Sequence, residues 1–442
     1  MPKFIGGLHL KENKLTRKKR TEEMPVPKRV ILPLRQHIGA PCSPIVKEGD
    51  KVKVGQKIAD STDFVSAPIH SPVSGIVIGI VKAPHPTLKE CEAILIESDK
   101  LMEKDDSTKK RENIETLSKE ELRRIIREAG IVGLGGAAFP THVKLTPPKE
   151  KKIDTVILNG AECEPYLTCD HRVMLEHPEK IIKGLQIITK ILEPEYCYIG
   201  IEDNKENAIA ILESKLQDMG LTDKIKVVRL KTRYPQGAEK NLIYSITKRV
   251  VPSNGGLPMD VGVVVQNVQT AKAIYDAVYE GKPLIERVIT VTGAVKEQKN
   301  LLVKIGTPTK DIIEYCKGYT NAIGKIIFGG PMMGIAQKTN NVPIIKGSSG
   351  ILVQAIVEPE EKETECIRCG RCIDVCPMLL MPTIIAKYSD NENYEKAEEY
   401  FALDCYECGC CAYVCPSKIP LVEKIRKAKE EITRKKKERS TK

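Results

Sequence analysis

The apolar side chains of residues 120–130, EELRRIIREAG, recur with the spacing of a helix rather than a strand. They fall at three- and four-residue intervals, at Leu122, Ile125, Ile126 and Ala129. Such spacing places them on one face of an amphipathic helix, whereas a half-buried strand would alternate apolar and polar residues. We therefore predict a helix that ends directly before the glycine-rich run GLGGAAFPTHVK.

This glycine run satisfies the dinucleotide fingerprint G-x-G-x-x-G/A through Gly133, Gly135 and Ala138. An ordinary fingerprint follows a strand and opens directly into a helix. Here a predicted helix precedes the run, and Phe139-Pro140 stands where the next helix should begin. The pattern does not fit an ordinary Rossmann loop, so the rest of the chain must decide what the run binds.

Residues 32–60 and 66–77 predict short strands joined by Gly-Asp and proline turns. The pattern resembles the barrel-sandwich hybrid fold of biotinyl and lipoyl carrier domains. A carrier needs a lysine at the tip of its hairpin, and the corresponding stretch, STDFVS, has none. We expect a structural or docking role. Near the other end, NYEKAEEYFALD is rich in helix-forming residues.

No stretch of about 18 apolar residues is present, so we expect no transmembrane helix. The first residues lack the apolar core of a secretory signal, which predicts a location in the cytoplasm or on the cytoplasmic face of a membrane complex. The net charge is +11, with basic clusters at 17–20 and 434–437. These clusters are typical of solvated tails or of docking to an anionic membrane or an acidic partner. We expect no nucleic-acid binding, because tryptophan is absent and no recognition motif occurs.

Nine of the 15 cysteines lie between residues 366 and 415. They include two runs of the form C-x2-C-x2-C-x3-C-P, ending at Pro377 and Pro416. In two-cluster ferredoxins the fourth cysteine of each run ligates the other cluster. The predicted ligands of one 4Fe–4S cluster are therefore Cys366, Cys369, Cys372 and Cys415, and those of the second are Cys405, Cys408, Cys411 and Cys376.

Zinc is the alternative for these cysteines, but structural zinc usually takes two well-separated C-x2-C pairs. Four cysteines within eleven residues fit that pattern poorly. Cys410 falls outside both runs and is interpreted as a bystander thiol. Two clusters in one fold predict a one-electron relay, and a flavin is the cofactor that joins such a relay to a two-electron hydride carrier.

The glycine run and the later stretch NGAECEP resemble the FMN- and NADH-binding domain of the flavoprotein subunit of respiratory complex I. That family carries G-x-G-G-A-G-F-P-T-G-x-K-W and N-A-D-E-S-E-P-G. YPQGAEKNLI and QNVQT resemble its G-E-E-T-A-L-I and N-N-V-E-T stretches. The resemblance implies cofactor-binding roles for Gly133, Gly135, Gly136, Phe139, Lys144, Asn159, Glu162, Glu164, Gly237, Glu239, Asn267 and Thr270.

The chemistry of these residues agrees with the resemblance. Glycine N–H groups and Lys144 suit a phosphate, and Asn159 and Asn267 suit the edge of an isoalloxazine. Phe139 offers a face for a nucleotide base or simply packs in the core. We assign the glutamates positioning rather than acid–base roles, because hydride transfer between nicotinamide and flavin needs no protein base. We therefore predict no catalytic acid or base.

The chain departs from the family motifs at Leu134, Ala161 and Leu145. An arginine, an acid and a tryptophan, respectively, stand there in the family. The loss of a cation and a carboxylate affects the expected NAD(H) site more than the FMN site.

Residues 286–350 resemble the soluble-ligand-binding β-grasp (SLBB) domain. With PLRQHIGAP near the start, the whole order resembles the RnfC family, the peripheral subunits of the Rnf complex, a membrane-bound ferredoxin:NAD+ oxidoreductase. The resemblance implies an α/β multidomain fold with a Rossmann-like FMN/NADH domain and an α-helical two-cluster ferredoxin domain. The expected segments are an extension (1–29), barrel-sandwich hybrid (30–100), FMN/NADH domain (115–285), SLBB domain (286–350), ferredoxin domain (356–425) and basic tail (426–442).

The family resemblance implies an oxidoreductase, a translocase component that exchanges hydride with NAD(H) through FMN. Its clusters would exchange electrons with integral membrane and iron–sulfur subunits, and indirectly with ferredoxin, while the complex moves Na+ or H+. The family acts as a peripheral protein on the cytoplasmic face of the cell membrane. Two alternatives stay open. One is an NADH-dependent cobalamin reductase of a bacterial microcompartment, and the other is an iron–sulfur scaffold with an inactive flavin pocket.

Overall fold

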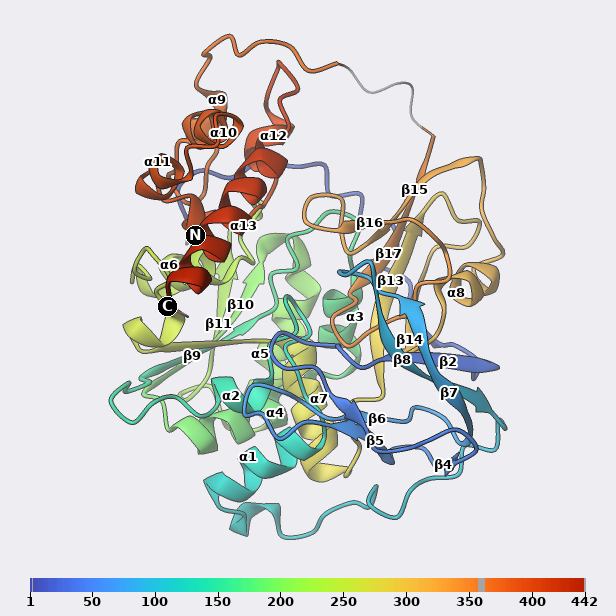
Figure 1. The fold of residues 1–442 in the computed structure, drawn as a ribbon. Coiled ribbons are helices and arrows are strands. Elements are labelled where there is room, and N and C mark those ends of the chain that lie inside the picture. Colours follow the sequence, from blue (N-terminus) through green and yellow to red (C-terminus); the bar gives the residue numbers. More distant parts are fainter. Residues whose placement is uncertain (2, 357–361, 441–442) are drawn as a thin grey trace.

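The computed structural model describes residues 1, 3–356 and 362–440 (Figure 1). The remaining positions belong to the expected N-terminal extension, ferredoxin domain and basic tail, and these parts of the three predictions lie outside the described residues. The architecture is mixed α/β with a group of helices at the C-terminal end of the chain, which confirms the predicted fold class.

A four-stranded parallel sheet forms the centre of the predicted flavin domain, with the strand order β11-β10-β9-β12. The strands are β9 (Thr155–Asn159), β10 (Tyr196–Glu202), β11 (Lys226–Leu230) and β12 (Val263–Asn267). The first four residues of β9 and of β12 are buried, as expected for a parallel sheet covered on both faces. The order fixes where a ligand can enter, because the chain moves outward from β9 in opposite directions to β10 and to β12.

Helices cover this sheet, and the helix predicted from residues 120–130 is confirmed as α1. The α-helices of the domain are α1 (Lys119–Glu128), α2 (Thr141–Lys144), α3 (Cys169–Glu176), α4 (Pro178–Leu192), α5 (Glu206–Asp218), α6 (Glu239–Thr247) and α7 (Val268–Tyr279). Short 3-10 turns are η1 (Ile114–Thr116), η2 (Asp203–Lys205) and η3 (Pro258–Val261). Ser118 begins α1 with a capping box to Glu121, which satisfies two otherwise free N–H groups. Helices α4 and α7 approach closely at Gly184, where a Cβ would lie 1.8 Å from the carbonyl oxygen of Ala271.

The predicted strands of the N-terminal third form two small antiparallel sheets, ordered β2-β8-β7-β4 and β3-β5-β6. The strands are β2 (Arg29–Pro33), β3 (Ser43–Pro44), β4 (Lys51–Val52), β5 (Lys57–Asp60), β6 (Ile69–His70), β7 (Gly75–Pro84) and β8 (Glu90–Ser98). Their apolar side chains belong to the same continuous core as those of the flavin domain. The two domains are therefore packed against each other over a shared apolar interior.

A six-stranded mixed sheet, ordered β1-β14-β13-β17-β15-β16, follows the flavin domain. Its elements are β13 (Glu286–Gly293), β14 (Lys299–Lys304), α8 (Thr309–Tyr315), β15 (Ile323–Phe328), β16 (Ile335–Gln337) and β17 (Gly350–Ala355). The first strand, β1 (Thr21–Glu23), comes from the expected N-terminal extension and pairs in parallel with β14. The extension therefore completes a sheet rather than preceding the fold as a separate tail.

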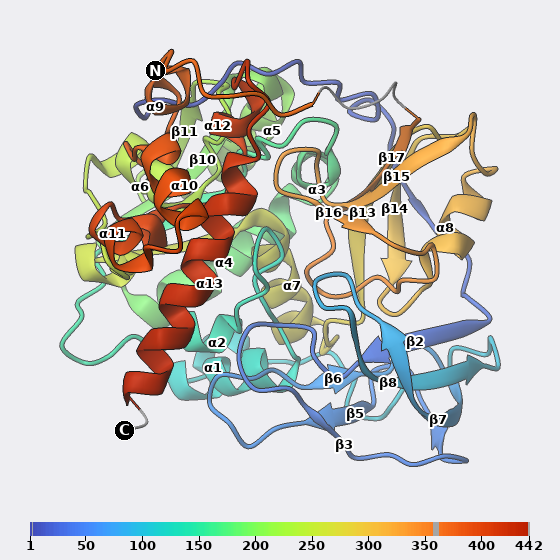
Figure 2. The same ribbon diagram turned by 45° about the horizontal axis from the view of Figure 1, so that its top comes forward.

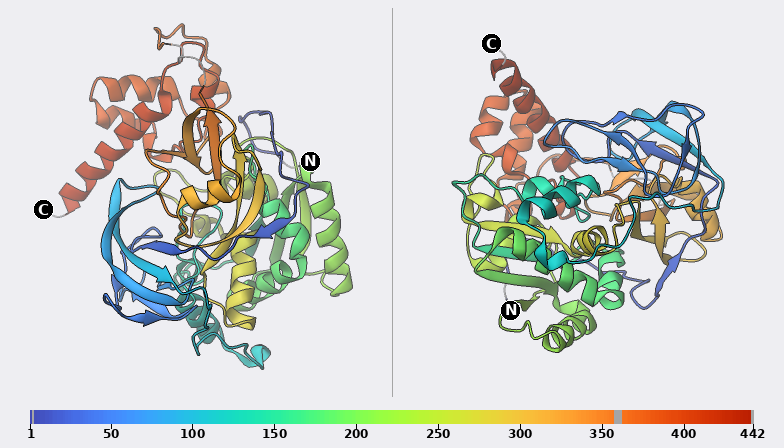
Figure 3. Two further views of the ribbon diagram at one scale, coloured as in Figure 1. Left: turned by 90° about the vertical axis from the view of Figure 1, so that its right-hand side faces the viewer. Right: turned by 90° about the horizontal axis from the view of Figure 1, so that it is seen from below.

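The C-terminal part is helical, as predicted from its composition. It contains α9 (Arg371–Asp374), α10 (Pro382–Asp390), α11 (Tyr394–Glu399), η4 (Ala402–Asp404), α12 (Cys410–Tyr413) and α13 (Leu421–Ser440). Figure 2 and Figure 3 show α13 extending to the C-terminus at the edge of the molecule. Most of the expected basic tail is thus helix, anchored by buried Ala428 and Ile432. Within the described residues, no helix combines the length and the apolar character needed to span a membrane.

Candidate flavin and iron–sulfur sites

Asn159 and Asn267 end neighbouring strands and are paired across the parallel sheet. They lie at its carboxyl edge, between β9 and β12, where the strand order reverses. Ligands of open α/β sheets bind outside the carboxyl ends of the strands at this switch point. The structure therefore brings two predicted flavin-binding residues together at the place where such a sheet can hold a cofactor.

The glycine run forms a loop whose base is fixed and whose tip is exposed. Gly133 donates to the Phe139 carbonyl oxygen at 2.9 Å, and the N–H of Leu134 donates to the hydroxyl of Thr270 at 2.9 Å. The tip residues Gly135, Gly136 and Ala137 are exposed.

The loop lies against the end of β12. At Gly135 a Cβ would lie 2.6 Å from Nδ2 of Asn267, so a side chain there would push the loop away from the strand. At Gly136 a Cβ would meet no atom within 4 Å. A close-lying backbone with an open outer face fits the predicted phosphate-binding role.

A second group of predicted residues gathers on the α6 side of the same edge. Asn159 donates through Nδ2 to the carbonyl oxygen of Gly237 at 2.8 Å. Lys144 forms an ion pair with Glu239 at 2.6 Å and donates to the carbonyl oxygen of Val265 at 3.1 Å. Its ammonium group is thus shared with a carboxylate. Phe139, half-buried, stands at the end of the glycine loop.

Glu162 and Glu164 bind groups of the protein itself. Glu162 accepts from the N–H of Asp170 at 2.7 Å, which caps the start of α3, and it lies 3.8 Å from Nζ of Lys14. Burial raises the pKa of Glu162 to about 7, although Lys14 opposes the shift. Their predicted contact with a cofactor stays a prediction.

Glu164 joins the flavin domain to the SLBB domain. It accepts from the N–H groups of Met332 and Met333 at 3.2 and 2.8 Å, within the turn GGPMMG. Burial raises the pKa of Glu164 to about 7, and the two amides oppose the shift.

Asp170 and Arg287 belong to the site but carry no motif that sequence reasoning could use. Asp170 is buried and accepts from Nδ2 of Asn267 and Nε2 of Gln269, at 2.7 and 2.8 Å. Arg287 comes from β13, far along the chain, and donates to the carbonyl oxygen of Leu134 at 3.1 Å. Both contacts depend on tertiary packing, so local spacing gives no sign of them.

The cysteines of the two runs interleave as the crossed assignment requires. One apolar cavity is lined by four of them together with the bystander Cys410: Cys376, Cys405, Cys408 and Cys411. The remaining four include Cys372, whose electrostatic neighbours are Cys415 and Cys366. Burial raises the pKa of Cys405 to about 11, a shift that metal coordination overcomes by removing the proton. Four soft thiol ligands around one cavity fit a 4Fe–4S cluster.

The two cysteine groups differ in their surroundings. Cys366 and Cys369 are exposed, whereas Cys376, Cys408 and Cys411 are buried. The buried group adjoins the flavin domain, because the hydroxyl of buried Tyr234 donates to the carbonyl oxygen of Cys408 at 2.7 Å.

Cys163 extends this contact toward the carboxyl edge of the sheet. It packs in the same apolar cluster as Tyr234 and Cys408. At Gly237 a Cβ would lie 3.2 Å from the Cys163 sulfur, so the cluster reaches the residue that binds Asn159.

Comparison with known proteins follows this order of domains. Family models match as follows: RnfC barrel sandwich hybrid domain at residues 2–101, Nuo51 FMN-binding domain at 126–276, SLBB domain at 288–336 and 4Fe-4S dicluster domain at 365–419. The RnfC protein of the proton-translocating ferredoxin:NAD(+) oxidoreductase complex of Clostridium ljungdahlii is 53% identical over 432 residues, which cover 97% of this chain and 93% of that protein. The chain belongs to the RnfC family.

Other members of the RnfC family give the same picture. The protein from the Na(+)-translocating ferredoxin:NAD(+) oxidoreductase complex of Acetobacterium woodii is 46% identical, with 97% of each chain covered. The protein from the ion-translocating oxidoreductase complex of Rhodobacter capsulatus is 43% identical, with 85% of this chain and 73% of that protein covered. These relatives confirm the predicted family and favour its oxidoreductase function over the cobalamin reductase alternative. The matched domains confirm FMN and 4Fe–4S clusters as its cofactors.

A solved NAD+-reducing [NiFe]-hydrogenase in its H2-reduced state resembles this chain in fold. The TM-score is 0.51 at 15% identity, over 71% of this chain and 63% of the hydrogenase chain. At this identity the likeness supports the fold alone.

Proposed function

We propose that this RnfC-family protein exchanges hydride between NAD(H) and FMN at the carboxyl edge of the parallel sheet. It then exchanges single electrons with partner subunits through two 4Fe–4S clusters. The FMN site would use Gly133, Gly135, Gly136, Phe139, Lys144, Asn159, Glu162, Glu164, Gly237, Glu239, Asn267 and Thr270. FMN supplies the step between one- and two-electron chemistry when bound.

The contact between the two candidate sites supports this proposal most directly. Tyr234 and Cys163 fill the space from Gly237, at the edge of the sheet, to Cys408, at the buried cluster cavity. Electron tunnelling falls steeply with distance and is favoured through packed, hydrogen-bonded protein. An unbroken connection of this kind suits a relay, whereas an iron–sulfur scaffold with an inactive flavin pocket would not require it.

The burial of the cysteines gives the relay an order. The cluster of Cys405, Cys408, Cys411 and Cys376 would stand next to the flavin. The cluster of Cys366, Cys369, Cys372 and Cys415 would stand at the surface, where a partner can approach. The chain's task is then to position each cofactor and to exclude water from the buried one, because exposure and hydrogen bonding set a cluster's potential.

We further propose that the chain is a peripheral subunit on the cytoplasmic face of the cell membrane. Its partners would be the integral membrane and iron–sulfur subunits of the complex, which couples electron flow from ferredoxin to Na+ or H+ movement. The membership of the family and the exposed residues Arg17–Arg20 support this location. The segment boundaries 30–100, 115–285, 286–350 and 356–425 are proposed as the limits of the four domains.

Anaerobic titration of the reconstituted protein with NADH tests the function. Visible absorbance follows bleaching of the flavin, and electron paramagnetic resonance follows reduction of the clusters. We expect both signals to change. A protein that contains FMN and both clusters but keeps unchanged spectra with NADH would refute the proposal. Protein stripped of FMN provides the control, because its clusters should stay oxidised.

A further inference from the structure

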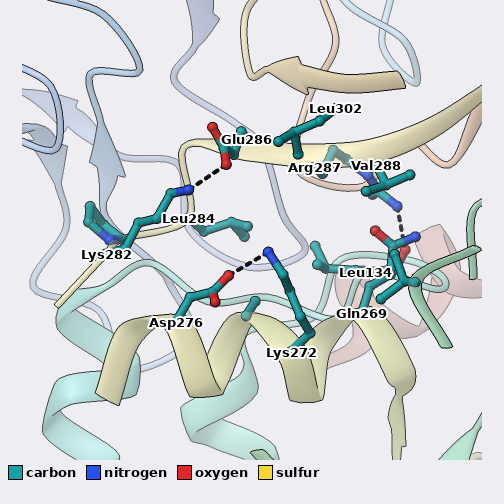
Figure 4. Close-up of a pocket in the computed structure, with 13 residues that line it drawn as sticks. Leu134, Gln269, Lys272, Asp276, Lys282, Leu284, Glu286, Arg287, Val288 and Leu302 are labelled. Atoms are coloured by element: carbon teal, nitrogen blue, oxygen red, sulfur yellow. Dashed lines mark hydrogen bonds and ion pairs between the residues drawn. The ribbon is translucent and has the colours of Figure 1, made fainter. Parts of the chain in front are cut away.

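The guanidinium group of Arg287 lies beneath the glycine loop and has no carboxylate partner among the described residues. Arg287 is 2% exposed. It donates through Nη2 to the carbonyl oxygen of Leu134 at 3.1 Å and through Nη1 to that of Lys346, and among the described atoms its Nε has no hydrogen-bond partner. Figure 4 shows the side chain reaching from β13 toward Leu134 and Gln269. A buried cation normally pairs with an anion, so its isolation requires an explanation.

A second buried cation lies at the other end of the loop. Lys346 is 1% exposed, and its ammonium group donates to the carbonyl oxygens of Pro68 and Gly130, at 2.6 and 2.8 Å. Asp170 is the carboxylate nearest in effect to Arg287, but its oxygens accept from Asn267 and Gln269. The base of the loop therefore carries positive charge that the neighbouring carboxylate does not directly bind.

The geometry of the peptide bond carries this charge to the exposed side of the loop. A trans peptide is planar, and its N–H points away from its C=O. Because Arg287 binds the Leu134 carbonyl from below, the N–H of exposed Gly135 points away from Arg287. A cation on the carbonyl polarises the peptide and makes its N–H a stronger donor, since hydrogen bonds in chains reinforce one another.

We propose that Arg287 is a positioning residue for a nucleotide phosphate bound on the glycine loop, acting through the Leu134–Gly135 peptide. This inference rests on the proposed function. It also accounts for Leu134, which stands where the complex I family carries an arginine. The cation comes from the SLBB domain instead, while the Leu134 side chain is buried in the core and its N–H binds Thr270.

Binding of FMN and riboflavin to the flavin-free protein tests this role, because riboflavin lacks the phosphate. For Arg287→Met we expect FMN to bind about 10- to 100-fold more weakly, the worth of a charge-assisted hydrogen bond, with riboflavin affinity nearly unchanged. Arg287→Lys should recover part of the loss, because the charge remains. Binding of FMN by the wild-type protein in the same titration separates failure of this inference from failure of the proposed function.

Two further variants separate charge from loop rigidity. Thr270→Val removes the other hydrogen bond to Leu134 without changing charge, so it should reduce the preference for FMN over riboflavin less than Arg287→Met does. Arg249→Met is the matched fold control, because Arg249 also binds a backbone carbonyl, that of Val261, but at the amino end of the sheet.

A phosphate of NAD(H) presents the same chemistry as that of FMN. Should the preference for FMN over riboflavin survive in Arg287→Met while the KM for NADH rises at least tenfold, the phosphate served is that of NAD(H). An unchanged preference together with an unchanged KM would overturn the inference. Equal weakening of FMN and riboflavin would overturn it too, because that result indicates a structural clip. Thermal unfolding and iron content of each variant establish that it folds.

Discussion

Replacing Cys376 with serine tests how the two cysteine runs share their clusters. Cys376 belongs to the first run in sequence, but its thiol lines the cavity of the second with Cys405, Cys408 and Cys411. Assignment by sequence would predict loss of the exposed cluster, whereas the structure predicts loss of the buried one. A chain with two four-iron clusters holds about eight irons, so Cys376→Ser should retain about four.

The identity of the surviving cluster decides the question. In Cys376→Ser the remaining irons should be those held near exposed Cys366 and Cys369, and a chelator should remove them quickly. NADH should still bleach the flavin, but it should reduce this remaining cluster much more slowly, because the intermediate carrier is gone. Iron analysis, paramagnetic resonance and stopped-flow absorbance measure the three effects.

Two variants provide the comparison. Cys415→Ser should show the converse, with the chelator-resistant cluster kept and still reduced by NADH. Cys410→Ser lies in the same cavity but outside both runs, and it should keep about eight irons. Loss of the exposed cluster in Cys376→Ser, with normal reduction of the buried one, would show that each run binds its own cluster and that our crossed assignment is wrong.

Three further predictions concern the flavin domain. Tyr234→Phe removes the hydrogen bond to the Cys408 carbonyl, so stopped-flow absorbance should show roughly 2- to 10-fold slower cluster reduction at an unchanged rate of flavin reduction; equal rates of cluster reduction would exclude a role for this contact. Lys144→Ala should weaken FMN binding about tenfold while iron stays near eight per chain, and unchanged FMN occupancy would refute its phosphate role. Gly184→Ala places a Cβ 1.8 Å from the Ala271 carbonyl oxygen and should lower the free energy of unfolding by about 1–3 kcal/mol, whereas Lys183→Ala on the same helix should change it by less than about 0.5 kcal/mol.

The elements that the sequence predicts well are those set by local chemistry. Apolar spacing predicts α1, and its capping box depends on residues only three positions apart. The cysteine runs predict their own crossing, because three thiols in one tight loop leave the fourth to turn away. The glycine run is correctly separated from an ordinary Rossmann loop, since a helix rather than a strand precedes it.

The features that sequence reasoning misses depend on residues far apart in the chain. Arg287 reaches Leu134 across 153 positions, and Lys14 reaches Glu162 across 148. Glu162 matches a cofactor motif, but its observed partner is the start of a helix, a contact that the motif alone does not reveal. The N-terminal extension is read as a tail because its strand has no partner nearby in sequence. That partner, β14, begins at Lys299.

The placement of β1 and of the residues before it has a consequence for biosynthesis. Leu8 bridges Tyr234, Gly7 donates to the carbonyl oxygen of Val375, and Thr21 pairs beside Asn300. Domains generally fold in the order in which the ribosome releases them, from the amino end onward. The opening segment of this polypeptide breaks that order, because its docking surfaces are translated last. It must wait, unpaired, until nearly the whole protein has emerged, and its arrival closes the assembly.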